Sequence, residues 1–190
     1  MTDLDNFEVF MKNYQDMVYG TALRMLGNQT DAQDIAQTVF LKAHEAFGSL
    51  SQSQSAGGWL KTVTTNLCLN HLTRYRNRWR FFSDLRSEDD DSEFVDTLAA
   101  PEQIDSPLDD AHRKQLLHDA LRKLPDAQRV PLVLFHFEDM PYDAIAAKLG
   151  VSLSKVKTDI HRGRLTLKRY LKPKFDDAGL ADGSSHLANL

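Results

Sequence analysis

The sequence predicts an all-α fold with two small helical domains joined by an acidic flexible linker, the C-terminal one a helix-turn-helix. Two observations lead to this prediction. Apolar residues recur every three or four positions through most of the chain, which is the spacing of amphipathic helices. Residues 87–112 instead hold ten Asp or Glu, two Pro and no Lys or Arg, and such a self-repelling segment cannot bury enough apolar surface to order itself. We therefore expect domains at residues 1–84 and 111–175, a linker at 85–110 and a disordered tail at 176–190.

The composition argues against several classes of protein. The single cysteine, Cys68, rules out an internal disulfide and a cysteine-based metal cluster within the chain, and we expect it to pack in the core. The seven histidines lack the spacing of metal ligands, and no nucleophile, acid–base group or phosphate loop is recognisable. The sequence therefore predicts neither an enzyme nor a cofactor or metal.

The acidic start "MTDLDNFEVF" lacks the pattern of a signal peptide. No stretch approaches the roughly 18 consecutive apolar residues that a membrane span requires. We expect a cytoplasmic protein.

The first domain begins with two predicted helices. Apolar spacing predicts a helix over residues 4–26, ended by the left-handed conformation that Gly27 or Asn28 favours. Thr30 and Gln33 have the spacing of a capping box for a second helix that runs to Phe47. Leu41 lies outside the apolar stripe of this second helix, beside polar residues. The surface around it is either a partner-binding face or a solvated face with one stray leucine.

A third helix is predicted over residues 59–80, after a polar loop at 48–58. Its first part is apolar, whereas its end is "RYRNRWR". Basic side chains interleaved with aromatic ones suit phosphate contact and base stacking. They are equally typical of a solvated helix end that the helix dipole favours.

The second domain is predicted to open with a helix over residues 113–124. Pro125 and Pro141 each mark a helix start. The apolar segment "VPLVLFHF" between them is interpreted as a buried helix, because no partner strand is available, and Pro131 should kink this helix or delay its start.

The last part of this domain has the pattern of a helix-turn-helix. A short helix from Tyr142 to Leu149 precedes Gly150, which permits a tight turn, and Ser152 can cap the next helix. Helical spacing places apolar residues on one side of that helix, namely Leu153, Val156, Ile160, Gly163, Leu167 and Leu171. The outward residues are small, polar and basic, namely Ser154, Thr158, His161, Arg162, Lys168 and Arg169.

Residues 154–175 hold eight Lys or Arg and one Asp, so this helix is predicted to enter the major groove of DNA and to contact phosphates. A generic basic amphipathic helix is the competing interpretation. An anionic membrane is disfavoured as the target, because the apolar side lacks a large aromatic residue.

Together, these segments resemble a bacterial RNA polymerase sigma factor of the extracytoplasmic-function (ECF) group, over roughly residues 7–171. "LGNQTDAQDIAQTVFLKAHEAF" is similar to the family's core-polymerase-binding helix and its approach. "WLKTVTTNLCLNHLTRYRNR" is similar to its minus-10 promoter helix. The segment from "ALRKLPDAQRV" to "HRGRLTLKR" is similar to its minus-35-binding domain.

The resemblance implies a sigma factor that binds core RNA polymerase, recognises the minus-35 and minus-10 elements of promoter DNA and promotes melting. It implies polymerase contact by Asp34, Gln37, Thr38, Leu41, Lys42 and Glu45. It implies minus-10 contact by Trp59, Lys61, Thr62, Thr65, Asn66, Arg74 and Arg76. It implies minus-35 contact by Ser154, Lys155, Lys157, Thr158, His161 and Arg162. An anti-sigma factor at the inner membrane face is the further partner implied, and no small-molecule substrate is expected.

The sequence departs from the family pattern in the melting loop, where Ala56 replaces a common aromatic residue and Lys61-Thr62 a common tyrosine-arginine pair. It also departs at His44, where a tryptophan is common, and at Asp159, where an arginine is common. Beside phosphates, Asp159 would lower DNA affinity or accept a hydrogen bond from a cytosine amine. Two other functions stay open on the residues alone: a free-standing helix-turn-helix DNA-binding transcriptional regulator, and a helical interaction module that does not bind DNA.

Overall fold

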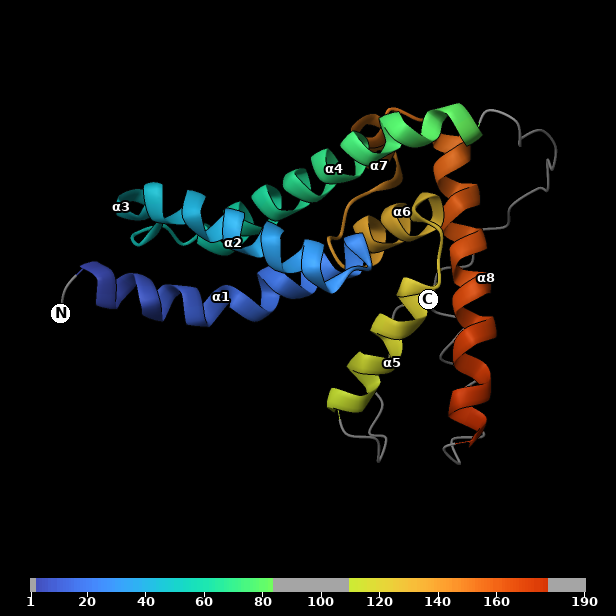
Figure 1. The fold of residues 1–190 in the computed structure, drawn as a ribbon, viewed down its shortest axis with the longest axis horizontal. Helices are drawn as coiled ribbons and strands as arrows, with labels where there is room; N and C mark the ends of the chain where they lie inside the picture. The colour runs from blue at the N-terminus through green and yellow to red at the C-terminus, as the bar shows by residue number, and fades with distance from the viewer. Residues whose placement is uncertain (1–2, 84–109, 178–190) are drawn as a thin grey trace.

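A computed structural model describes residues 3–83 and 110–177, with side chains for residues 6–73 and 113–172. These residues form helices joined by turns, with no strand among them, so the predicted all-α class is confirmed (Figure 1). The helices are α1 (Asp3–Leu26), α2 (Gln29–Glu45), α3 (Phe47–Leu50), α4 (Ala56–Ser83), α5 (Asp110–Arg122), α6 (Asp126–His136), α7 (Tyr142–Leu149) and α8 (Leu153–Asp177). We call α1–α4 the N-terminal bundle and α5–α8 the C-terminal bundle. The predicted linker and tail lie outside the described residues, except that α5 begins at Asp110 and α8 runs on to Asp177, two residues into the predicted tail.

The N-terminal bundle packs α1 against α2 and α4. In α1 the core stripe includes Val18, Ala22 and Met25, each at most 1% exposed. The helix ends at Gly27, which has a φ of +66° and donates its N–H to the carbonyl of Leu23 at 2.8 Å. This is the left-handed ending that the sequence predicts.

The second helix begins earlier than predicted and has a different cap. Oδ1 of Asn28 accepts hydrogen bonds from the backbone N–H groups of Thr30 (2.9 Å) and Asp31 (3.2 Å). Asn28, with extended backbone, is therefore the N-cap, and Thr30 lies inside the helix. Asparagine caps at least as well as threonine, so it takes the position as soon as the chain leaves Gly27.

The predicted polar loop is partly helical. Residues 47–50 form the short helix α3, and Leu50 is buried at 6% exposure. The next helix, α4, starts at Ala56 rather than Trp59, because Ala56 is itself buried in line with Leu60, Thr64 and Cys68. The hydroxyl of Thr64 donates to the Leu60 carbonyl at 2.7 Å, so its burial leaves no hydrogen bond unmade. Cys68 packs in the core, as expected.

The C-terminal bundle is built around the apolar helix α6. Pro125 is the N-cap of α6, and Pro131 lies within the helix without delaying its start. Leu132, Val133 and Leu134 are at most 1% exposed, which confirms the interpretation of this segment as a buried helix. The contacts of α8 run along α5, α6 and α7.

The helix-turn-helix forms as predicted, with one difference. Gly150 ends α7 with a φ of +66°, and Oγ of Ser152 accepts from the backbone N–H of Lys155 at 3.2 Å, which caps α8. Val156 and Ile160 are buried at 1% exposure, whereas Leu153 is 44% exposed. Leu153 was predicted on the buried side, but it is the first residue of α8, at the exposed end of the helix.

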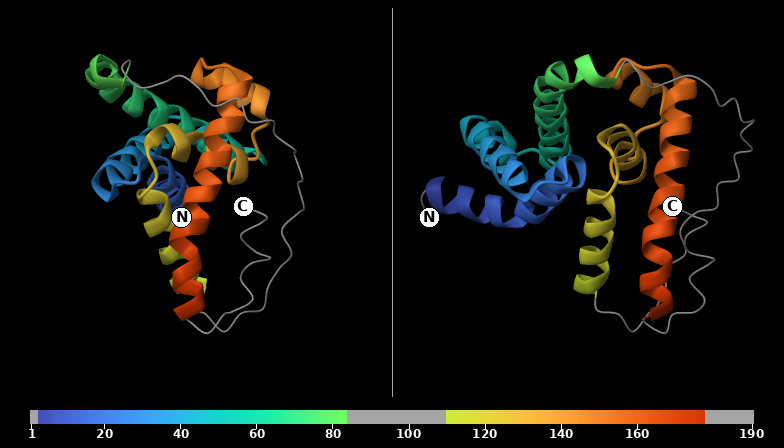
Figure 2. Two further views of the ribbon diagram at one scale, coloured as in Figure 1. Left: turned by 90° about the vertical axis from the view of Figure 1, so that its right-hand side faces the viewer. Right: turned by 45° about the vertical axis from the view of Figure 1, so that its right-hand side comes forward.

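The two bundles are in contact through α6, which lies between the C-terminal end of α1 and the middle of α8 (Figures 1 and 2). Arg129 of α6 is 5% exposed and crosses to α1. Its guanidinium donates to the carbonyls of Met25 (3.1 Å) and Leu26 (2.9 Å), and also to that of Leu124 in its own bundle (3.0 Å). Asp126 forms an ion pair with it. The sequence predicts two domains but not this junction.

Within the described ranges, none of the helices combines the length and apolar character needed to cross a membrane. The same ranges contain no group of three or more His, Cys, Asp or Glu side chains arranged to hold a metal ion.

Gly163 lets α8 approach α6 closely. A Cβ at this position would lie 2.8 Å from Cδ1 of the buried Leu132 and 3.4 Å from the Gln128 carbonyl oxygen. We expect Gly163→Ala to lower the free energy of unfolding by about 1–3 kcal/mol, as measured by chemical denaturation. Gly58→Ala is the matched control, because a Cβ there meets nothing within 4 Å in α4; its unfolding free energy should stay level or rise. Equal effects of the two substitutions would contradict the packing described.

His136 of α6 predicts a pH dependence of stability. Its Nε2 accepts a hydrogen bond from Nε of Arg164 at 3.2 Å. Burial first, and the charge of Arg164 second, lower the pKa of His136 to about 4. As the pH falls from about 6.5 to about 4, His136 therefore binds a proton in the unfolded chain but not in the folded chain. The free energy of unfolding decreases over this range. We expect His136→Gln to lose less stability than wild type over this window in urea titrations, and parallel losses would contradict the assignment.

Candidate nucleic-acid interface

The polar face of α2 presents one large apolar side chain. Ala32, Ile35, Val39 and Ala43 turn into the bundle, so the residues between them turn outward. Leu41 is 61% exposed. The residues predicted with it are exposed, except that Thr38 is half-buried and donates its hydroxyl to the Asp34 carbonyl at 2.8 Å. These residues are Asp34, Gln37, Thr38, Lys42 and Glu45. All six predicted polymerase-binding residues thus share one surface of α2.

His44, the departure in this helix, lies at the edge of that surface. Its ring meets the ring of Phe7 edge to face, with centroids 4.9 Å apart and planes at 87°. The residue is exposed, so the imidazole covers the end of the aromatic cluster of α1 and does not enter the core.

The predicted minus-10 residues of α4 fall into three groups. Thr62 and Asn66 are exposed, and Trp59 and Lys61 are half-buried. Thr65 is 4% exposed, next to the buried Thr64. Its hydroxyl is therefore not accessible to a DNA base in this arrangement. Arg74 and Arg76 belong to the later turns of α4, where side chains lie outside the described residues.

Two of these α4 side chains are already engaged by the C-terminal bundle. Nζ of Lys61 donates to the Phe137 carbonyl at 3.4 Å and lies 3.8 Å from Oε2 of Glu138. Oδ1 of Asn66 accepts from Nζ of Lys148 at 2.8 Å. The sequence carries no signal of these contacts, because they join residues more than 70 positions apart.

The basic surface of α8 is displayed as the helix-turn-helix pattern predicts. Ser154, Lys155, Lys157 and Arg162 are exposed, and Thr158 and His161 are half-buried. Lys168 and Arg169, which follow these six residues along α8, are also exposed. Arg164 is different, because it turns inward to His136 and lies 5.6 Å from the centroid of the Phe135 ring. The outward face therefore carries small polar groups near the N-terminus of α8 and cations along its length, which suits base edges and phosphates respectively.

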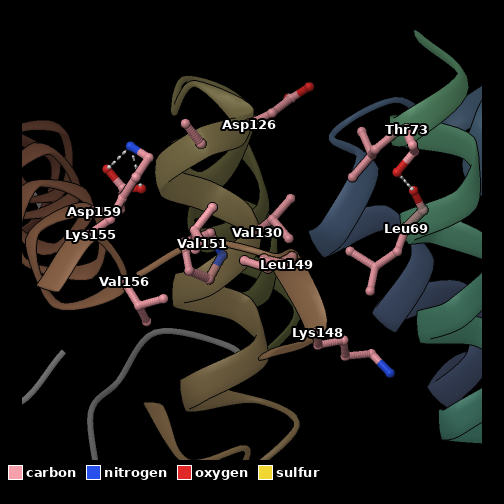
Figure 3. A pocket seen from close by; sticks show the side chains of 13 residues that line it. Leu69, Thr73, Asp126, Val130, Lys148, Leu149, Val151, Lys155, Val156 and Asp159 are labelled. Atoms are coloured by element: carbon pink, nitrogen blue, oxygen red, sulfur yellow. Dashed lines mark hydrogen bonds and ion pairs between the residues drawn. The ribbon is translucent and has the colours of Figure 1, made fainter. Parts of the chain in front are cut away.

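Asp159 does not face the DNA-binding side, contrary to the expectation. It is 8% exposed, and Oδ2 of its carboxylate lies 3.1 Å from Nζ of Lys155 one turn earlier (Figure 3). The helix turns position 159 toward α6, beside Val156 and Ile160. Asp159 therefore orients Lys155 and does not oppose phosphates on that face.

Two family models match the chain. The model for sigma-70 region 2 matches residues 10–79, which belong to the N-terminal bundle. The model for sigma-70 region 4 matches residues 114–167, in the C-terminal bundle.

Named relatives agree with these matches. The ECF RNA polymerase sigma factor SigE of Mycolicibacterium smegmatis is 34% identical over 178 residues, which are 88% of this chain and 62% of that protein. The chain thus spans less than two thirds of SigE. The RNA polymerase sigma-H factor of Pseudomonas aeruginosa is 30% identical over 175 residues, which are 90% of this chain and 89% of that protein.

Among solved structures, the co-crystal structure of the sigma factor RpoE with the anti-sigma factor NepR, from Bartonella quintana, contains a chain that is 23% identical. It matches with a TM-score of 0.49, over 87% of this chain and 96% of that one.

The match to region 2 thus precedes the match to region 4 along the chain. In addition, the sigma-H factor is 30% identical to this chain along most of the length of both proteins. The chain belongs to the ECF sigma factors of bacterial RNA polymerase, which direct promoter-specific initiation of transcription.

Proposed function

We propose that three surfaces of this chain divide the work of a sigma factor. The polymerase face of α2 consists of Asp34, Gln37, Thr38, Leu41, Lys42 and Glu45. The minus-10 face of α4 consists of Trp59, Lys61, Thr62 and Asn66, continued by Arg74 and Arg76. The minus-35 face of α8 consists of Ser154, Lys155, Lys157, Thr158, His161 and Arg162.

The observation that carries this proposal is the α8 surface. One side of the helix is buried down to Leu167 and Leu171, so its rotation about its own axis is fixed. The Ser152 cap fixes where it begins. A helix held in this way presents its first outward turns to a major groove, while Arg162 and the cations after it lie where phosphates flank the groove.

The α2 surface favours a sigma factor over a free-standing regulator. A large exposed apolar side chain ringed by polar groups matches the apolar centre and polar rim of a protein–protein interface. A regulator that binds DNA through α8 alone has no need of this surface. Core RNA polymerase is the partner that the family assigns to it, and the polymerase supplies the chemistry, so no catalytic group is assigned to this chain.

The minus-10 face has the chemistry to hold an unpaired base. The amide of Asn66 can both donate to and accept from a base edge, and Trp59 offers a ring for stacking. We expect the chain to act on promoters in the cytoplasm and to be held inactive there by an anti-sigma factor at the inner face of the membrane, as the resemblance implies.

Removing one cation from the minus-35 face should weaken DNA binding in a salt-dependent way. We expect Arg162→Ala to lower the affinity of the polymerase complex for promoter DNA and to reduce the slope of log K against log salt by about one. Fluorescence anisotropy over a salt series measures both quantities. Arg122→Ala is the matched control, because Arg122 has a 48% exposed side chain on α5, away from this face. An unchanged slope for Arg162→Ala would remove Arg162 from the face.

Truncating Leu41 should weaken polymerase binding without unfolding the chain. We expect Leu41→Ala to lower the affinity for core RNA polymerase about tenfold, because an apolar side chain at the centre of an interface loses its burial. Competition for labelled core polymerase provides the measurement. Val9→Ala, at a position 56% exposed on α1, should bind as wild type does. Equal affinities of the Leu41 and Val9 variants would contradict the assignment.

A further inference from the structure

The start of α8 holds an ion pair between a covered carboxylate and an exposed cation. Nζ of Lys155 lies 3.1 Å from Oδ2 of Asp159 and donates to Oδ1 at 3.4 Å (Figure 3). The side chain of Asp159 is 12% exposed and that of Lys155 is 52% exposed. Both carboxylate oxygens therefore face one ammonium group, and the lysine is the member of the pair that reaches solvent.

The backbone of Lys155 is fixed as well. Its N–H donates to Oγ of Ser152 at 3.2 Å, and the next residue, Val156, is 1% exposed. A lysine on a free helix surface samples many rotamers. Here the backbone is held by the cap and by burial, and the ammonium group is held by the carboxylate.

A second ion pair in the chain shows how unusual the first one is. Lys12 and Glu8 of α1 have the same spacing and lie 2.7 Å apart, but their side chains are 64% and 59% exposed. Such an exposed pair contributes little to stability. Covering a carboxylate instead carries a desolvation penalty, which an apolar side chain at the same position would avoid. Asp159 therefore points to a role other than folding.

The position of Lys155 suits contact with a base edge. It is the third residue of α8, and the first residues of a recognition helix are the ones that meet bases in the major groove. Guanine presents two acceptors there, O6 and N7, which lysine commonly binds. Adenine presents one acceptor beside a donor, and cytosine presents a donor that an ammonium group cannot accept.

The carboxylate also changes how this lysine responds to phosphates. The negative charge of Asp159 compensates much of the positive charge of Lys155, so the attraction to the DNA backbone, which is the same for every sequence, becomes weaker. The ammonium group has three donors, and the two carboxylate oxygens can take two of them. At least one N–H is left for a directed hydrogen bond to a base.

We propose that Asp159 is a positioning residue for recognition of the minus-35 element. It holds Lys155 toward a guanine of that element and keeps the lysine from binding phosphates of any sequence. Lys155 is then a specificity-determining residue, and Asp159 acts through it. This inference rests on the proposed minus-35 face of α8.

The experiment measures base preference with the full chain bound to core RNA polymerase. The DNA is the segment upstream of this protein's own gene, with each base pair of its minus-35 element replaced in turn. We expect wild type to lose about tenfold in affinity when one particular G·C pair is replaced. Lys155→Met should bind the original and the replaced DNA within about twofold of each other. Lys155→Arg keeps donors for O6 and N7 and should keep the tenfold preference.

Asp159→Asn separates positioning from a structural role. We expect its affinity for DNA of unrelated sequence to rise about threefold, with a steeper dependence on salt, because the charge of Lys155 is no longer compensated. Its preference for the guanine should fall from about tenfold to about threefold. A structural defect would instead lower the affinity for both DNAs together. Glu8→Gln is the matched control, since it removes the acid of the exposed pair on α1; both quantities should stay at the wild-type values.

Three results would each overturn the proposal: no guanine preference in wild type, an unchanged preference in Lys155→Met, or an Asp159→Asn variant that loses affinity for both DNAs equally. Lys155 is exposed, so its variants test the proposal even where Asp159→Asn unfolds. Failure of the minus-35 face itself is separate, because it appears as an unchanged salt slope in Arg162→Ala.

Discussion

The capping of α1 by Arg129 is the interaction on which the arrangement of this molecule depends. A helix leaves its last carbonyls without partners and carries a partial negative charge at that end. Here a guanidinium from another bundle donates to the carbonyls of Met25 and Leu26. It fits because Gly27 has no side chain: a Cβ there would lie 2.8 Å from Nη1 of Arg129. Gly27 is thus required both by its positive φ and by the space the arginine occupies.

Burying a cation is costly, and the surroundings of Arg129 show how the cost is offset. Burial lowers the pKa of Arg129, while the charge and hydrogen bond of Asp126 act in the opposite direction. Three carbonyls and one carboxylate accept hydrogen bonds from the three nitrogens of the guanidinium. The start of α6 is therefore fixed on α1, and α6 in turn packs against α7 and α8 of the helix-turn-helix. Leu41 on the polymerase face of α2 stays exposed beside this junction, and so do Thr62 and Asn66 of α4.

Local patterns in the sequence predict much of this structure, because local physics decides it. Gly27 and Gly150 end helices where a left-handed residue is needed, Ser152 caps α8, and the stripe of α2 separates its buried and exposed sides. Periodicity fails where neighbours in space decide. Leu153 is exposed at the first position of α8, Thr65 is buried although Asn66 beside it is exposed, and Asp159 is buried and paired with Lys155. The junction made by Arg129 and Glu138 links segments more than 100 residues apart, and no local pattern contains it.

We infer that this chain brings RNA polymerase to a promoter and that the DNA opens there. Permanganate probing of unpaired thymines in the DNA upstream of this protein's own gene tests that statement most directly. With core RNA polymerase and the chain together, we expect reactive thymines in one short segment near position −10, and none with either component alone. Protection of the DNA by the chain alone, with no reactive thymines after polymerase is added, would contradict the account and identify a free-standing DNA-binding regulator.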